Sequence, residues 1–108
     1  MDAFELTTLL EENARADKLY LEFLHVPSLS MGVYRLPAGS VDPQSPHTED
    51  EVYYVVGGRA QIRVGDEERS VGPGSIVYVA ASVPHRFHTI EGELIVLVFF
   101  APTEYSQA

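Results

Sequence analysis

Short apolar segments separated by glycine and proline turns are the feature that most constrains the fold of this chain. Their residue types, rich in Val, Ile, Leu, Tyr and Phe, are typical of β-strands. We expect about seven or eight strands, no long helix and no internal repeat. This pattern predicts an all-β sandwich or barrel. The clearest segments are 18–26, 29–36, 52–56, 59–64, 67–71, 75–79 and 93–100.

One of these segments alternates cleanly and predicts a hairpin. In residues 59–64, Ala60, Ile62 and Val64 fall on one face and would point inward. Gly65-Asp66 then offers a two-residue turn into the next strand, since glycine accepts a positive φ at its first position. Just before this hairpin, Gly57-Gly58 is expected to end the strand that spans 52–56.

The N-terminal residues predict a short helix outside the barrel. Asp2-Ala3-Phe4-Glu5 has the form of a capping box, and apolar residues at helical spacing continue to about Asn13. We therefore expect an N-terminal extension over 1–17, a barrel over 18–101 and a tail over 102–108. Segments 18–26 and 93–100 are apolar on both faces, which requires an opposing sheet or a second subunit. A homodimer is the partner that this pattern favours.

Length and charge exclude several classes of protein. A chain of 108 residues has room for one domain and one modest core. Its net charge of −9, with Lys18 as the single lysine, argues against binding nucleic acid or an anionic membrane. The absence of cysteine excludes disulfides and thiolate metal sites. No secretory signal or membrane-spanning apolar run is apparent, so the cytoplasm is the expected location.

Three side chains are candidate metal ligands. His47 and Glu51 have the same parity, so an extended backbone would direct both to one face, and His85 would approach from another strand. Two imidazoles and one carboxylate form the facial triad of non-haem Fe(II) sites. Zn, Mn, Ni and Cu are alternatives, because ligand type alone discriminates poorly among them.

The spacing of these residues resembles the two sequence motifs of the cupin superfamily. The first motif runs Gly, five residues, His-x-His, three or four residues, Glu, six residues, Gly. The second runs Gly, five residues, Pro-x-Gly, two residues, His, three residues, Asn. The positions that match are Gly39, His47, Glu51, Gly58, Gly74 and His85. Those that depart are Ser45 for the first His, and Ala80, Ser82 and Thr89 in the second motif.

The resemblance implies a jelly-roll, RmlC-like β-barrel with a metal at its centre. In the full family pattern three His and one Glu hold the ion, and three of these four carry over here as His47, Glu51 and His85. Ser45 stands in the fourth position, and Glu49 is an alternative because it has the parity of Glu51. No cofactor besides a divalent transition metal is expected.

Further side chains are candidates for catalysis. Tyr53 shares the parity of Glu51 and Tyr78 is a further potential acid, with packing in the core as the alternative role. His88 has the opposite parity to His85 and is expected at the surface, and His25 is interpreted as structural. We expect a metal-dependent enzyme, an oxygenase or an isomerase or lyase, acting on a small organic molecule. The alternatives are a non-catalytic cupin that binds or senses a small ligand, and a structural dimer with a vestigial site.

Overall fold

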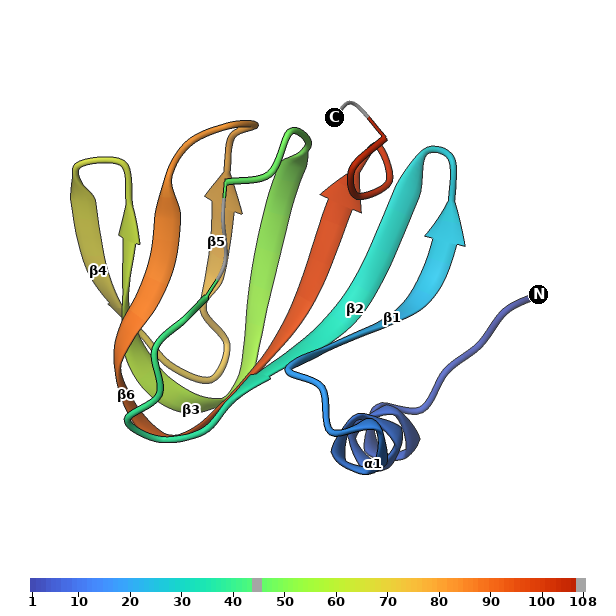
Figure 1. The fold of residues 1–108 in the computed structure, drawn as a ribbon, viewed down its shortest axis with the longest axis horizontal. Helices are drawn as coiled ribbons and strands as arrows, with labels where there is room; N and C mark the ends of the chain where they lie inside the picture. The colour runs from blue at the N-terminus through green and yellow to red at the C-terminus, as the bar shows by residue number, and fades with distance from the viewer. Residues whose placement is uncertain (44–45, 107–108) are drawn as a thin grey trace.

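One N-terminal helix and six antiparallel strands form the part of the chain that is described, residues 1–43 and 46–106 of a computed structural model (Figure 1). This arrangement confirms the prediction of an all-β fold with a short helix. The strands are fewer than expected because β3 includes two of the expected segments. The elements are α1 (Leu6–Ala16), β1 (Tyr20–Val26), β2 (Leu29–Leu36), β3 (Asp50–Val64), β4 (Glu67–Val71), β5 (Ile76–Val79) and β6 (His85–Ala101).

Strands β3 and β6 form the central ladder, which continues past Gly57 and Gly58. The expectation that these glycines end a strand was wrong. They shift the register of the ladder and bend it, as bulges do. Gly58 has φ +81, and a Cβ there would clash with the carbonyl oxygen of Glu93. Glycine therefore permits the two strands to approach each other at the bend.

The bend folds the sheet over on itself. β6 pairs with one edge of β3 along most of its length, while β5 pairs with residues 51–54 and β4 with residues 60–64 on the other edge. β2 extends the sheet beyond β6, and β1 follows β2. The enclosed face carries the hydrophobic core, in which the largest fully buried apolar side chains are Tyr53, Phe87, Phe100, Leu36 and Leu94.

The predicted hairpin is confirmed, since Val64 pairs with Glu67 across Gly65-Asp66. Ala60 and Ile62 are buried, as their alternation indicated. The strand expected over 29–36 has the bounds of β2, whereas β6 begins at His85 rather than at residue 93. The expected strand over 93–100 therefore lacked the first eight residues of β6.

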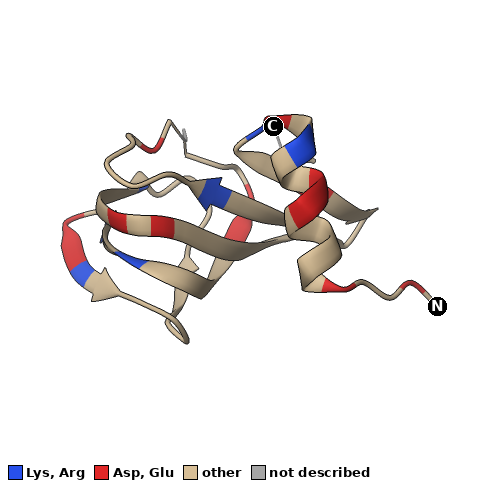
Figure 2. Cartoon of the chain, turned by 90° about the horizontal axis from the view of Figure 1, so that it is seen from below, with Lys and Arg blue, Asp and Glu red and all other residues tan. Residues whose placement is uncertain are grey.

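Helix α1 begins later than its sequence suggested. Glu5 is the N-cap residue and makes no side-chain capping bond, so the capping box expected at Asp2 does not form. The helix packs against β1 and β2, burying Leu9 and Asn13. No helix within the described residues has the length and apolar character needed to cross a membrane. Figure 2 shows acidic residues distributed over α1 and the strands, with basic residues scattered singly between them.

Two of the residues that differ from the second motif have a left-handed backbone conformation. Ser82 has φ 65 and Thr89 has φ 51. The corresponding family residues, Gly and Asn, adopt this conformation readily, while a β-branched threonine does so at a cost. At both positions this chain therefore holds a residue less suited to the left-handed conformation than the motif residue would be.

Candidate metal centre

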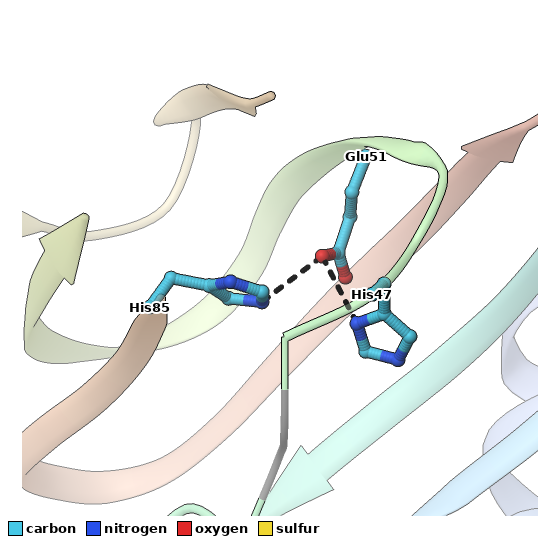
Figure 3. A group of neighbouring side chains, drawn as sticks. All are labelled: His47, Glu51 and His85. Carbon is cyan, nitrogen blue, oxygen red and sulfur yellow. Dashed lines mark ion pairs between the residues drawn. The ribbon is translucent and has the colours of Figure 1, made fainter. Parts of the chain in front are cut away.

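His47, Glu51 and His85 converge inside the sheet (Figure 3). Their side chains are at most 7% exposed, and one ligand atom from each lies within 4.8 Å of the other two. His85 Nε2 is 3.0 Å and His47 Nδ1 is 3.5 Å from the same oxygen, Oε1 of Glu51. The structure thus brings together the three residues that the sequence analysis selected.

Strand parity does not explain why His47 and Glu51 converge, which corrects the expectation from the sequence. His47 precedes β3, and the backbone bends at Thr48 and Glu49 before the strand begins. An extended backbone therefore does not join His47 to Glu51. A backbone hydrogen bond from Ser82 N to the carbonyl oxygen of His47, 2.6 Å long, instead ties this segment to the loop that leads to His85.

Each imidazole has one nitrogen that faces Glu51 and one that is directed elsewhere. His85 Nδ1 lies 2.9 Å from the carbonyl oxygen of Val83, to which it can donate, so that Nε2 is left to face Glu51. His47 Nε2 lies 3.0 Å from Oε2 of Glu104, so that Nδ1 faces Glu51. Both rings therefore present a nitrogen lone pair to the centre when the outward nitrogen carries the proton.

Without a metal, the mutual attraction of the three groups favours protonated imidazoles on His47 and His85 and an ionised carboxylate on Glu51. Burial alone would lower the pKa of His47, but the carboxylates of Glu104 and Glu51 beside its ring raise that pKa to about 9. The pKa of His85 is likewise raised against the effect of burial, chiefly by Glu51. Burial would raise the pKa of Glu51, yet the two imidazoles lower it. The charged forms of His47, His85 and Glu51 are thus favoured although all three side chains are buried.

Four buried atoms test whether a metal fits this site. Within the described chain, His47 Nδ1, both carboxylate oxygens of Glu51 and His85 Nε2 make no hydrogen bond of acceptable geometry. They are compensated by the ion pairs to Glu51 alone, whereas buried polar groups in native proteins usually make well-formed hydrogen bonds. A divalent cation would satisfy nitrogen and oxygen donors of this kind at once. The donor set therefore fits a transition metal ion.

The two candidate tyrosines lie in different surroundings. Tyr53 is fully buried, and its ring lies 5.9 Å from that of His85 and 4.9 Å from that of Phe87. Tyr78 is on β5 paired with Val52, so its side chain leaves the sheet on the face opposite Glu51 and is exposed. The structure does not bring Tyr78 to the site.

The remaining polar candidates lie outside the triad. His88 contacts Glu68 near the surface, at 2.8 Å, and His25 contacts Glu22 and Thr103. Glu49 is buried, but one of its oxygens accepts a hydrogen bond from Tyr105 N. Ser45 lies outside the described residues.

A hollow of about 430 Å³ opens beside His47. Most of its lining, including Tyr20, Glu104 and Tyr105, could not be recognised from the sequence, because these strand and tail positions carry no motif residue. Pro102, directly after the last strand, was the one local signal that the tail turns back in a fixed path. The lining residues are Leu19, Tyr20, Tyr34, Pro43, His47, Phe100, Glu104 and Tyr105.

A curled antiparallel sheet that encloses two histidines and a glutamate defines a small β-barrel protein with a candidate metal centre. Residues 32–100 match the family model described as the cupin domain, and this chain belongs to that family. An RmlC-like cupin from Methanocaldococcus jannaschii with a double-stranded β-helix fold superposes with a TM-score of 0.71, at 20% identity over 80% of this chain and 81% of the other.

Two relatives are similar in sequence. An uncharacterised Streptomyces coelicolor protein, SCO3923, is 52% identical over 104 residues, which cover 96% of this chain and 99% of the relative. The dimethylsulfoniopropionate lyase DddQ of Ruegeria pomeroyi is 31% identical over 74 residues, 68% of this chain and 37% of the lyase. The solved structure of DddQ has a TM-score of 0.68 with this chain, covering 82% of it and 49% of the lyase.

Proposed function

We propose that this cupin binds a divalent transition metal ion through His47, Glu51 and His85 and acts as an enzyme on a small organic molecule. The observation that carries the proposal is the set of buried nitrogen and oxygen atoms that face one another without hydrogen bonds. Three protein ligands leave coordination positions open for a substrate, as in catalytic rather than structural metal sites. A bound ion would supply Lewis-acid polarisation of a substrate oxygen, or oxygen activation in the case of Fe(II).

The hollow beside His47 is the place for the substrate. Among the described residues its lining is largely aromatic and contains no Lys or Arg, and His47 is the member of the triad that it reaches, so the hollow favours an uncharged or apolar part of the substrate. Tyr20 has a buried hydroxyl without a hydrogen-bond partner in the described chain. Burial and the nearby Glu104 carboxylate raise its pKa, so Tyr20 keeps its proton and does not act as a base.

Tyr53 has a supporting role in this proposal. It is fully buried behind His85, and its ring contacts are with His85 and Phe87. A side chain without exposed surface packs the imidazole in place and does not meet a substrate in the hollow. We therefore assign the substrate contacts to Tyr20 and the neighbouring aromatic residues.

Among the reaction types, we favour lyase or isomerase chemistry over oxygenation. The support is the relationship to DddQ, whose name records a lyase activity. The second candidate is a non-catalytic cupin that holds a small ligand, and it is favoured by the loss of one family histidine at Ser45.

Metal analysis of protein purified without an affinity tag tests the proposal. We expect about one equivalent of a transition metal after incubation with Fe(II), Zn, Mn or Ni, measured by elemental analysis after desalting. His47→Ala and His85→Ala should abolish retention of the ion. His88→Ala, which removes a surface imidazole bonded to Glu68, should not. Wild-type protein that stays metal-free with all four ions would refute the enzyme proposed here.

Activity assays then separate the reaction types. Loaded protein should convert dimethylsulfoniopropionate or a sugar acid, followed by NMR, without consuming oxygen. Oxygen uptake with catechols or diketones would replace the lyase or isomerase assignment by an oxygenase. Saturable binding of a compound without turnover would instead favour the binding protein.

A further inference from the structure

Glu104 is the side chain outside the triad that contacts it most directly. Its Oε2 lies 3.0 Å from His47 Nε2, on the edge of the imidazole that faces away from Glu51. Both side chains are largely buried, at 14% and 5% exposed. A carboxylate in this position accepts the Nε2 proton, which leaves the Nδ1 lone pair directed to the centre.

The turn that carries Glu104 is fixed by contacts to three parts of the molecule. Glu104 N donates to Oγ of Ser30, a fully buried residue of β2, at 2.9 Å. Tyr105 N donates to Oε1 of Glu49, just before β3, at 2.6 Å. Thr103 N donates to the carbonyl oxygen of Pro27 at 3.3 Å. These bonds involve backbone atoms of the turn, so they position the Glu104 side chain before any metal arrives.

Aromatic contacts restrict the plane of the His47 ring. The ring of Phe100 lies 4.6 Å from it and that of Tyr105 lies 5.5 Å from it, between centroids. Packing fixes the plane of the ring but does not determine which of its two nitrogens carries the proton. Glu104 is the group placed to decide it.

A direct ligand role for Glu104 is disfavoured by the geometry. The ligand atoms that lie within 4.8 Å of one another come from His47, Glu51 and His85, and Glu104 is not among them. It meets the opposite nitrogen of the same imidazole that a metal would use.

We propose that Glu104 is a positioning residue that fixes His47 in the Nε2-protonated tautomer, so that Nδ1 is the metal-binding nitrogen. The inference rests on the proposed function, since it assigns how one ligand of that site is oriented. It also gives the turn after β6 a part in the site that the family motifs do not contain.

Affinity for Zn²⁺, measured by competition with a chromophoric chelator, tests this role in the full chain. Glu104→Ala should weaken binding about 10- to 100-fold, the range found for partners of metal-bound histidines. Glu104→Gln retains an acceptor oxygen and should recover part of the loss. Glu68→Ala, which removes the partner of His88, is the matched control and should leave the affinity unchanged.

Nitrogen NMR of Zn²⁺-loaded, ¹⁵N-histidine-labelled protein reports directly which nitrogen of His47 carries the proton and which binds the metal. The wild-type spectrum should show His47 with a protonated Nε2 and a metal-bound Nδ1, and Glu104→Ala should lose this single state. Metal bound at Nε2 of His47, or unchanged affinity in Glu104→Ala, would overturn the positioning role. Loss of binding as complete as in Glu51→Ala would overturn it in favour of a ligand. Wild-type protein that binds none of Zn²⁺, Fe(II), Mn and Ni would instead refute the proposed function itself.

Discussion

Glu51 and His85 lie at opposite ends of one β-ladder, yet their side chains meet at 3.0 Å. In the pairing of β3 with β6, Glu51 is opposite Phe100 and His85 is opposite Val64. An uncurled ladder would hold these positions far apart, because each residue advances a strand by about 3.3 Å. The bend at Gly57 and Gly58 brings the two ends together across the interior. The geometry of the site therefore depends on a backbone feature that contributes no ligand.

Gly58→Ala should be strongly destabilising for this reason. The added Cβ would clash with the carbonyl oxygen of Glu93 and would also occupy a left-handed backbone conformation. We expect the free energy of unfolding to fall by about 2–4 kcal/mol, measured by urea titration. Gly74→Ala is the matched control, since Gly74 has φ +93 and a Cβ added there would meet no atom within 4 Å. It should cost only about 1 kcal/mol, and equal losses at both positions would contradict the importance of close approach.

Thr89→Asn should stabilise the protein. Thr89 holds a left-handed conformation at φ 51, which asparagine tolerates better than a β-branched residue. We expect a gain of about 0.5–1 kcal/mol, seen as a rise of a few degrees in Tm by calorimetry. Thr89→Val keeps the branched shape and removes the hydroxyl, so it should give no gain. A comparable rise in Thr89→Val would show that backbone strain is not the cause.

The sequence was most informative where structure depends on local chemistry. The hairpin at Gly65-Asp66 and the bounds of β2 follow from turn residues and alternation within a few positions. The triad was found because its spacing matches a family motif. By contrast, Gly58 could equally end a strand or bend one, and only the partner strand decides between these outcomes.

Glu104 illustrates a second limit of prediction from sequence. Nothing in its neighbours marks a carboxylate that lies in the tail segment as part of a site. Its contact with His47 spans 57 positions in the chain, from residue 47 to residue 104. Such a contact arises from the path of β6 and the turn after it, which tertiary pairing determines.

The metal-free protein should lose stability as the pH rises toward 9. His47 has a pKa of about 9 in the folded chain and 6.5 as its ordinary value, so the folded state binds the proton more tightly. This stabilisation is fully present below pH 6.5 and disappears as the pH rises through 9. Urea titrations between these values, with His47→Gln for comparison, measure the effect. A wild-type pH dependence that equals that of His47→Gln would contradict the assignment.

Metal binding should show the opposite trend over the same range. A ligand imidazole must lose its proton, so affinity for Zn²⁺ should increase with pH until His47 is deprotonated. Calorimetric titration in buffers of different ionisation enthalpy should reveal protons released on binding. Affinity that is independent of pH would show that His47 does not compete with protons for the ion.

The outer face of β3 and β5 should form the contact of a homodimer. Ile76, Tyr78 and Tyr54 are 68%, 60% and 41% exposed there, and Tyr54 pairs with Ile76 in the ladder. An exposed group of large apolar and aromatic side chains can pair with its own copy across a two-fold axis. Light scattering should give twice the mass of one chain, and Ile76→Glu should give the monomer. Val41→Glu, at an exposed apolar residue elsewhere, is the control. A monomeric wild type would contradict the prediction.

The bend at Gly57 and Gly58 also determines when the metal centre can exist during folding. A hairpin such as β3–β4 can form early from nearby residues, but Glu51 and His85 meet only after the whole sheet has closed. Ion capture should therefore coincide with the last cooperative step of folding and not with an early collapsed state. A metal bound there would hold the closed sheet together, slowing its global opening while leaving the fraying of α1 unchanged.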